Sequence, residues 1–207
     1  MSDTIVLATR NKGKIAELAL LLAPYNLTVL GLDAFPDVEE VEETGTTFEE
    51  NALLKARAVA AATGHVAIAD DSGIEADALD KRPGVYSARY SDDTPDLPGN
   101  TRDARNNAKI LRELADVEDA RRTGRFCCVM AAATPDGRSI VAYGKWEGMI
   151  ARAPEGDNGF GYDPLFIDLA TGMRAAAMTK EAKNQCSHRG KALRRLMELW
   201  PDFWAAR

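Results

Sequence analysis

A short apolar run that ends at two adjacent acids constrains this chain more than any other feature. Val66–Ala69 is followed directly by Asp70, Asp71, Ser72 and Gly73. Buried strands of parallel sheets read as near-continuous apolar runs, and in open α/β sheets ligands collect beyond the carboxyl ends of such strands. We therefore expect a buried strand that delivers two carboxylates to a sheet edge, where they suit a metal-assisted site. A plain turn is the alternative, because Asp-Ser-Gly is common turn chemistry.

Strand and helix patterns alternate along the first part of the chain, which predicts a mixed or parallel α/β sheet. Capping boxes are available to the second helix from Thr46 with Glu49 or from Thr47 with Glu50. The expected strands are Thr4–Thr9, Leu27–Leu32 and Val66–Ala69, and the expected helices are Gly13–Leu22 and Thr47–Ala62.

The later part of the chain has a different pattern. A helix is expected at Arg102–Leu114, followed by strands at Arg125–Thr134 and Ser139–Ile150 around a turn at Pro135–Arg138. This predicts a long antiparallel hairpin. Its arms would extend the sheet beyond the first unit into a second lobe, with a cleft between the two lobes.

Composition limits the class of protein. A chain of 207 residues can bury about 70% of its unfolded surface. Its three cysteines include no Cys-x-x-Cys pair, which favours reduced thiols over disulfides or a zinc site. We expect no signal peptide and no membrane span, and therefore a cytoplasmic protein. The net charge of −6 disfavours polynucleotide binding, because clustered Lys and Arg supply most of that affinity.

The segment Thr9–Lys14 lies between the first expected strand and helix. Free backbone N–H groups and the helix dipole make such a position a ready anion site, so the segment is a candidate phosphate cradle. It is not a Walker A loop, since Ala8 and Ile15 stand where that motif needs Gly and Ser or Thr. Solvated surface lysines are the alternative.

Glu155–Pro164 is a glycine-rich loop that carries Phe160 and Tyr162. An aromatic ring on such a loop can stack on a base, a contact worth about 1–3 kcal/mol per base. A turn that tucks both rings into the core is equally compatible with the sequence.

Ser187-His-Arg-Gly190 opens the last expected helix, with Ser187 as N-cap and Pro201 as its end. Cations at a helix N-terminus oppose the macrodipole, so His188 and Arg189 are best explained if they face a ligand acceptor. His65, just before the third strand, is assigned a structural role.

Seven motifs in this order resemble the inosine triphosphate pyrophosphatase family, also called XTP/dITP diphosphatases, nearly end to end. Each motif alone is weak, and the series is specific. One departure is Arg10, where the family commonly has a small residue. The motifs are Thr-x-Asn-x-x-Lys at Thr9–Lys14, Glu-Glu-Thr-Gly at Glu42–Gly45, Phe-x-Glu-Asn-Ala-x-x-Lys-Ala at Phe48–Ala56, Ala-Asp-Asp-Ser-Gly at Ala69–Gly73, Pro-Gly-Val-Tyr-Ser-Ala-Arg-Tyr at Pro83–Tyr90, Gly-Phe-Gly-Tyr-Asp-Pro at Gly159–Pro164 and Ser-His-Arg-Gly at Ser187–Gly190.

The resemblance implies an α/β, two-lobed fold on a long mixed β-sheet with flanking helices and a central cleft, formed by residues 1–207 as a single domain. It also implies hydrolysis of deaminated purine nucleoside triphosphates to monophosphate and pyrophosphate, a Mg²⁺ requirement and a homodimer.

Site roles also follow from the resemblance. Asp71 would be the proton acceptor, and Glu42 and Asp71 would ligate the metal. Lys55 would be a further phosphate contact and Ser72 a substrate contact. The phosphates would be held by Thr9, Arg10, Asn11, Lys12, Gly13 and Lys14, and the base by Phe160, Gly161, Tyr162, Asp163, Lys183, His188 and Arg189.

Two other classes remain open at this point. A nucleotide-binding regulator could use the same residues without turnover, although it would not need the acids Glu42, Asp70 and Asp71. A pyrophosphatase for modified pyrimidine or methylated nucleotides is the closer rival. A haloacid-dehalogenase-type phosphatase is disfavoured, because its Asp-x-Asp arrangement is absent.

Overall fold

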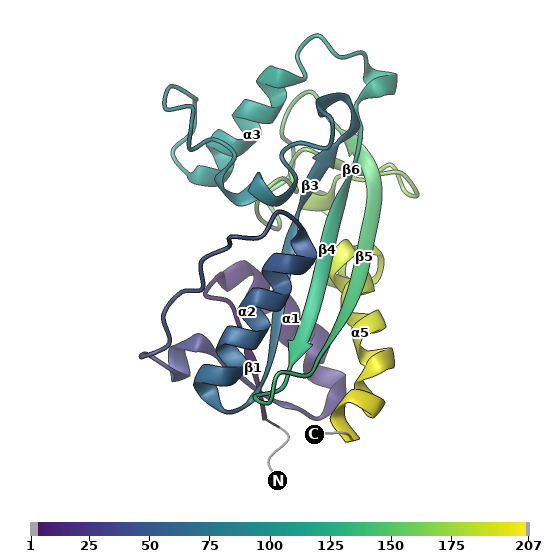
Figure 1. The fold of residues 1–207 in the computed structure, drawn as a ribbon. Helices are drawn as coiled ribbons and strands as arrows, with labels where there is room; N and C mark the ends of the chain where they lie inside the picture. The colour runs from purple at the N-terminus through teal and green to yellow at the C-terminus, as the bar shows by residue number, and fades with distance from the viewer. Residues whose placement is uncertain (1–3, 206–207) are drawn as a thin grey trace. The chain divides into compact units, whose positions relative to one another are not determined.

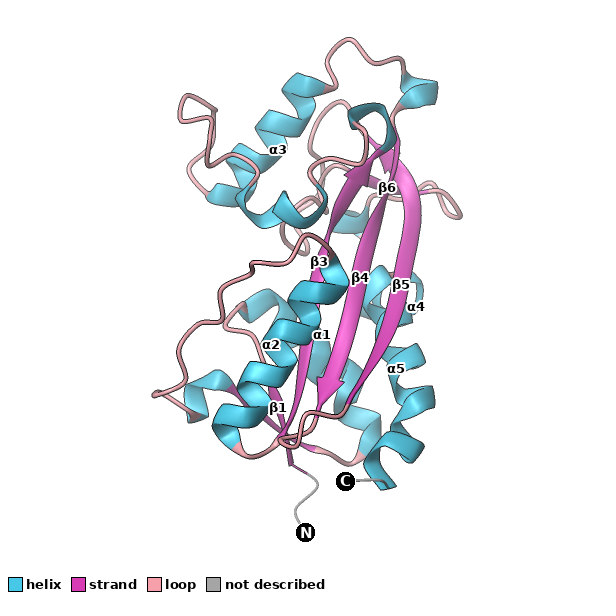
Figure 2. Ribbon diagram, in the orientation of Figure 1, coloured by secondary structure: helices cyan, strands magenta, loops and turns pink. Residues whose placement is uncertain are grey.

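The computed structural model describes residues 4–205, which form a mixed sheet with helices (Figures 1 and 2). Short 3₁₀ turns join several of these elements. The strands are β1 (Thr4–Leu7), β2 (Thr28–Gly31), β3 (Val66–Ala76), β4 (Thr123–Ala133), β5 (Ser139–Ile150) and β6 (Phe166–Asp168), and the helices are α1 (Lys12–Leu22), α2 (Phe48–Thr63), α3 (Arg102–Glu113), α4 (Lys180–Cys186) and α5 (His188–Ala205).

The six strands form one sheet in the order β2-β1-β3-β4-β5-β6. β1 is parallel to β2, with Thr4 opposite Thr28, and parallel to β3, with Ile5 opposite Val66. β5 and β6 are antiparallel. The expected mixed α/β sheet is therefore confirmed.

The chain divides into two compact units whose boundaries fall within β3, β4 and β5 and between Ser187 and His188. Unit 1 contains residues 1–71, 128–144 and 188–207, and unit 2 contains residues 72–127 and 145–187.

Unit 1 has helices on both faces of its part of the sheet. One core joins alternate strand residues such as Ile68 to α1 and α5, through Leu18 and Leu193. The other core joins the intervening residues, such as Ala67, to α2 through Ala56. This alternation is the period of two expected of a strand that is covered on both faces. Figure 1 shows α2 and α5 beside the long strands β4 and β5.

Unit 2 has its own core around three aromatic rings. Phe126, Trp146 and Phe166 lie with centroids 4.6–6.1 Å apart. The buried Trp146 donates from Nε1 to Asp168 at 2.8 Å, so its polar group is satisfied. Ile110 of α3 also lies in this core.

The expected end of β3 at the acid pair is wrong, because the strand continues to Ala76. Ile74 and Ala76 are buried in the core of unit 2, which favours continued sheet structure over a turn. Gly73 lets the strand pack closely against the segment at Gly84, since a Cβ there would lie 2.4 Å from the carbonyl oxygen of Gly84. Asp70 and Asp71 are thus inside a strand.

The expected end of the last helix at Pro201 is also wrong, since α5 continues to Ala205. Proline removes one helical hydrogen bond and can kink a helix without ending it. Trp200 and Phe203, on either side of Pro201, are both buried and their ring centroids lie 5.7 Å apart. Packing of these rings therefore accounts for the continued turn.

Several local expectations are confirmed. Thr47 is the N-cap of α2 and forms a capping box with Glu50, which selects the second of the two alternatives. β4 and β5 are joined by the expected turn, where Thr134 N donates to Arg138 O at 2.9 Å. Helix α4 and strand β6 were not expected from the sequence. Among residues 4–205, no helix is long and apolar enough to cross a membrane.

Candidate active site

Asp70 and Asp71 point to opposite faces of β3, because successive strand side chains alternate. Asp70 lies on the same face of β3 as Ile68 and contacts residues of α1 and α5. Asp71 lies on the same face as Ala69 and contacts residues of α2. Both carboxylates are buried. The two adjacent acids therefore have separate surroundings.

Asp71 lies in a cluster of oxygen atoms around the Lys55 ammonium. Lys55 Nζ is 3.1 Å from Asp71 Oδ1, 2.8 Å from Glu43 Oε1 and 2.8 Å from the backbone oxygen of Asp70. Asn51 Nδ2 donates to Asp71 Oδ2 at 3.2 Å, and its Oδ1 accepts from Gly45 N at 2.8 Å. The cluster thus orients both oxygens of Asp71.

Asp70 is held by cations from two helices. Lys14 Nζ lies 3.2 Å from Asp70 Oδ1. Arg189 donates to Asp70 Oδ2 from Nη2 at 3.0 Å and from Nε at 3.2 Å, and its Nη1 donates to Glu17. The charges of this buried group are therefore compensated, as buried charges need to be.

The pKa values of the two acids move in opposite directions. Burial works to raise the pKa of Asp70, but Lys14, Arg189 and Lys55 outweigh it and the pKa is lowered. Burial raises the pKa of Asp71, which Lys55 opposes and Glu43 reinforces. Asp70 is therefore held ionised, while Asp71 binds a proton more readily than an ordinary aspartate does. Burial lowers the pKa of Lys55, yet the three neighbouring acids Asp71, Asp70 and Glu43 raise it on balance.

The candidate phosphate loop Thr9–Lys14 begins α1. Asn11 is the N-cap, and its Oδ1 accepts from Gly13 N at 2.9 Å and from Lys14 N at 3.2 Å. Two of the N–H groups expected to face an anion therefore have a protein acceptor. Arg10 is exposed and its Nη2 donates to Val38 O at 2.9 Å, so it is directed toward the loop after β2.

The acids fit a divalent cation in their chemistry. Mg²⁺ prefers oxygen ligands and binds through one or two carboxylates together with substrate phosphates. The oxygens of Glu43, Asp70 and Asp71 already surround one positive charge, the Lys55 ammonium. Glu42 is exposed and lies next to Glu43 in the chain. Within residues 4–205, no group of three or more His, Cys, Asp or Glu side chains is arranged to hold a metal by itself.

The aromatic loop lies in unit 2. Phe160 is half-buried, whereas Tyr162 and Asp163 are buried. Asp163 Oδ2 accepts from Phe160 N at 2.9 Å and from Lys183 Nζ at 2.6 Å. Lys183 Nζ also lies 5.3 Å from the centroid of the Phe160 ring. Tyr162 therefore lies in the core, as the turn alternative predicts for that ring, whereas Phe160 is only half-buried and its stacking on a base stays a prediction.

The remaining expected site residues occupy both units. His188 is buried and is the first residue of α5, and Ser72 is half-buried in β3. Ser187 has extended backbone angles between α4 and α5, as the residue before a helix requires. His65 lies edge-on to Phe35, with centroids 5.9 Å apart, in keeping with its structural assignment.

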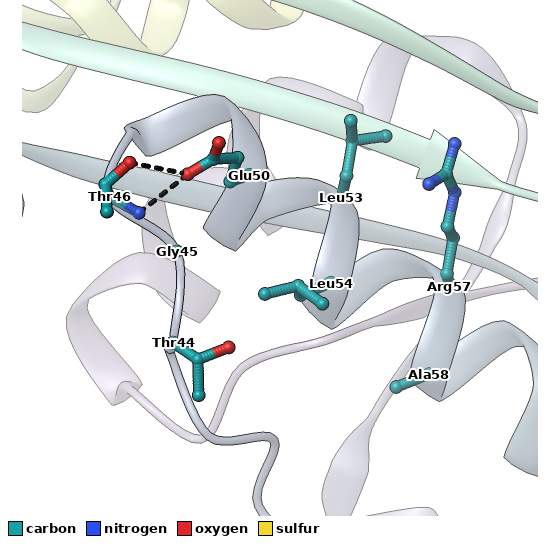
Figure 3. Close-up of a pocket in the computed structure, with 8 residues that line it drawn as sticks. All are labelled: Thr44, Gly45, Thr46, Glu50, Leu53, Leu54, Arg57 and Ala58. Carbon is teal, nitrogen blue, oxygen red and sulfur yellow. Dashed lines mark hydrogen bonds between the residues drawn. The ribbon is translucent and has the colours of Figure 1, made fainter.

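One surface hollow of about 650 Å³ lies beside the N-terminal half of α2 (Figure 3). Its lining does not include Lys55, Glu43 or Asp71. Glu50, one of its few charged groups, is engaged with Thr46 and Thr47 in capping the helix. The hollow is lined by Thr44, Gly45, Thr46, Glu50, Leu53, Leu54, Arg57 and Ala58.

Two residues near the acid pair, Asn51 beside Asp71 and Glu17 beside Arg189, received no role from the sequence alone. Asn51 precedes Lys55 by one helical turn, so the two share a face of α2. Glu17 follows Lys14 by three residues on α1 in the same way. This helical spacing was the sequence signal that could have grouped Asn51 with Lys55 and Glu17 with Lys14. It does not identify the residues that contact each helix face.

Fold and site together define an α/β protein whose mixed sheet carries buried acids, paired with lysine and arginine, in an inner strand. A model of the Ham1 family matches residues 5–199, and the chain belongs to that family. The resemblance inferred from the seven motifs is thereby confirmed.

Relatives and solved structures agree with this assignment. The chain is 75% identical over 201 residues to a dITP/XTP pyrophosphatase of Nitratidesulfovibrio vulgaris, covering 97% of each chain. It is 48% identical to a dITP/XTP pyrophosphatase of Streptococcus pyogenes, covering 98% of this chain but only 60% of the length of that relative. The structure of a HAM1 protein from Coxiella burnetii is similar with a TM-score of 0.84 at 40% identity, covering 98% of this chain and all of that one.

Proposed function

We propose that this chain hydrolyses the deaminated purine nucleoside triphosphates dITP, ITP and XTP to the monophosphate and pyrophosphate, and so cleanses the nucleotide pool. The observation that carries the proposal is the buried Asp71 carboxylate, held by Lys55 and Asn51. Support comes from the relative that is 75% identical over nearly the full length and is named a dITP/XTP pyrophosphatase. Magnesium dependence, a homodimer and a cytoplasmic location are parts of the same proposal.

Asp71 is the proposed proton acceptor. Its pKa is raised by burial, which suits a carboxylate that has to take a proton. Asn51 and Lys55 fix its two oxygens, so one of them is directed at an attacking water when the substrate is present. The water then attacks the α-phosphorus, and pyrophosphate leaves.

Positive charge from the chain stabilises the phosphates in this proposal. Lys14 and Lys55, with the Thr9–Lys14 loop, meet the charge that develops on the phosphate oxygens, which is the main help that phosphoryl chemistry can use. Glu42 and Asp71 would hold Mg²⁺, with Glu43 as the neighbouring acid. When bound, the ion would neutralise phosphate charge and lower the pKa of a coordinated water.

Selection of the base is assigned to the remaining residues. Hypoxanthine and xanthine present a 6-oxo acceptor, which suits donors on His188 and Arg189, whereas adenine presents an amino donor there. Arg189 already donates to Asp70 and Glu17, so its contact to a base would be made alongside these bonds. Phe160, Lys183 and Ser72 would complete the substrate contacts, together with Gly161, Tyr162 and Asp163 of the same loop.

The decisive experiment is a substrate panel. We expect dITP, ITP and XTP to be cleaved with release of pyrophosphate when Mg²⁺ is added, and GTP and ATP to be cleaved far more slowly. With chelator in place of Mg²⁺, we expect the rate to fall by at least about 10²-fold, because the phosphate charge is then not neutralised. Release of orthophosphate, or a preference for pyrimidine or methylated nucleotides, would contradict the proposal. Tight nucleotide binding without any turnover would indicate a regulator.

His188→Ala should weaken discrimination between ITP and ATP. Loss of one donor that matches the 6-oxo group is worth about 1–3 kcal/mol, which corresponds to about 5- to 150-fold in the ratio of kcat/KM. The measurement is kcat/KM for both nucleotides, with His65→Ala as the matched control because His65 contacts Phe35 in unit 1. An unchanged ITP:ATP ratio would remove the assigned role.

A further inference from the structure

Both backbone polar groups of Gly161, in the middle of the aromatic loop, are bonded to helix α3. Asp103 Oδ2 accepts from Gly161 N at 2.8 Å. Asn107 Nδ2 donates to Gly161 O at 2.9 Å. Asp103 and Asn107 are one helical turn apart and so lie on the same face of α3. This pair therefore fixes the peptide groups on both sides of Gly161.

Gly161 is a position where such support is needed. Its φ is +62°, in the left-handed region that other residues rarely adopt. A Cβ added there would meet no heavy atom within 4 Å, so glycine is favoured here by the backbone angle and not by lack of space. The contacts to Asp103 and Asn107 are the side-chain interactions that hold the polar groups of Gly161 itself.

Asn107 is placed at some cost to stability. It is buried, and its Oδ1 has no hydrogen-bond partner among the residues that the structure describes. An unsatisfied buried acceptor is unfavourable, and such groups in native proteins call for an explanation. Reversing the amide would turn Oδ1 toward the carbonyl oxygen of Gly161, so the observed orientation is the one that this contact requires.

The other members of the loop are also fixed within unit 2. Tyr162 Oη donates to Ser87 O at 2.8 Å, and Asp163 accepts from Phe160 N. The neighbouring Asn106 of α3 accepts from Ser91 N at 2.8 Å and donates to Ser87 O at 3.2 Å. Helix α3 thus supports the segment that holds Tyr162 as well as the loop itself. Phe160, whose ring is half-buried, directly precedes these anchored residues.

We propose that Asp103 and Asn107 are positioning residues that hold Phe160 in the orientation required for stacking on the base of the substrate. This inference rests on the proposed function, because it concerns how the same nucleotide is bound. Neither residue contacts the reacting atoms, so each acts through Gly161 and Phe160. The pair should therefore affect nucleotide binding much more than the chemical step.

The test begins with Asp103→Ala. We expect KM for ITP to rise about 5- to 20-fold while kcat stays within about threefold, since a lost binding contact that leaves the chemistry intact raises KM. Asn107→Asp should act in the same direction, because it places a carboxylate oxygen opposite Gly161 O. Asp103→Asn should retain most of the wild-type KM, because its amide oxygen can still accept from Gly161 N. Asp96→Ala is the matched control, as Asp96 is an exposed acid in the same unit.

A double-mutant cycle with Phe160→Ala separates positioning from a general loss of stability. If Asp103 acts through Phe160, then Asp103→Ala should change KM less than twofold in the Phe160→Ala background. An equal rise in KM in both backgrounds, or a fall in kcat with unchanged KM, would overturn the proposal.

Amide hydrogen exchange without substrate provides an independent readout. The Gly161 amide should exchange faster in Asp103→Ala than in wild type and in Asp96→Ala. Unchanged exchange together with unchanged KM would overturn the positioning role alone. If wild-type protein released no pyrophosphate from any nucleotide, the proposed function would fail instead, even where exchange at Gly161 responded as expected.

Discussion

Asp71→Asn is expected to abolish pyrophosphate release while leaving the fold intact. Asn cannot accept the proton from water and is a poorer metal ligand, and a lost general base alone costs about 10²–10⁴ in rate. We therefore expect kcat to fall at least about 10³-fold, a loss of about 4 kcal/mol in transition-state stabilisation. Steady-state assays with dITP and Mg²⁺ provide the measurement.

The fold should be kept in this variant. Asn has the shape of Asp, its oxygen can still accept from Lys55 Nζ, and Lys55 keeps the Glu43 carboxylate at 2.8 Å as a counter-charge. The new amide nitrogen faces the donor Asn51 Nδ2, and an unsatisfied buried group costs about 1–3 kcal/mol. Burial raises the pKa of Asp71, so a neutral side chain is less unfavourable at this position than at an exposed aspartate. We expect the free energy of unfolding to fall by about 1–3 kcal/mol, so that the variant still folds. Wild-type turnover in Asp71→Asn would show that Asp71 is not the proton acceptor.

The sequence predicted the strand that carries these acids but not the way in which they are divided. The apolar run Val66–Ala69 was sufficient to predict burial, but both acids were expected together at the sheet edge, whereas the alternation of side chains inside the continued strand places them on opposite faces. The partners of Asp70 lie far away in the chain: Lys14 by 56 residues and Arg189 by 119. No local pattern identifies such pairs. The separate roles of Asp70 and Asp71 therefore became visible only from the packing of α1, α2 and α5.

The errors have a common physical origin. Asp-Ser-Gly and Pro201 are strong local signals for a turn and for a helix end. In both elements a residue that follows the signal, Ile74 in β3 and Phe203 in α5, is buried, and its packing favours continuation of the strand or helix. Tertiary packing outweighs local preference at these positions.

The cations at the start of α5 illustrate the same limit. The sequence indicated that His188 and Arg189 need an acceptor, and we expected a bound ligand to supply it. The structure supplies protein acceptors for Arg189, in Asp70 and Glu17, so the unfavourable position near the helix N-terminus is compensated without a ligand. A contact between Arg189 and the base stays a proposal.

Asp70→Asn should lower stability more than Asp71→Asn does. The substitution leaves Arg189, whose side chain is only 2% exposed, without its main counter-charge, and weakens the hold on Lys14. Removing one partner of a buried ion pair costs about 3–5 kcal/mol, which for a chain of this size lowers Tm by roughly 6–20 °C. Urea unfolding and thermal denaturation are the measurements. Asp33→Asn is the matched control, because its carboxylate also lies near an arginine, Arg10, but is 94% exposed.

The cause of that loss can be tested with a second substitution. If the instability of Asp70→Asn comes from the uncompensated guanidinium, Arg189→Met in the same chain should recover part of it, because replacing both members of a buried pair by groups of similar volume is often nearly neutral. Glu17 has an 18% exposed side chain and can be solvated when Arg189 is removed. A Tm of Asp70→Asn within about 2 °C of wild type, or strictly additive losses in the double variant, would contradict this account. The adjacent aspartates would then not be divided into one that holds the fold and one that performs the chemistry.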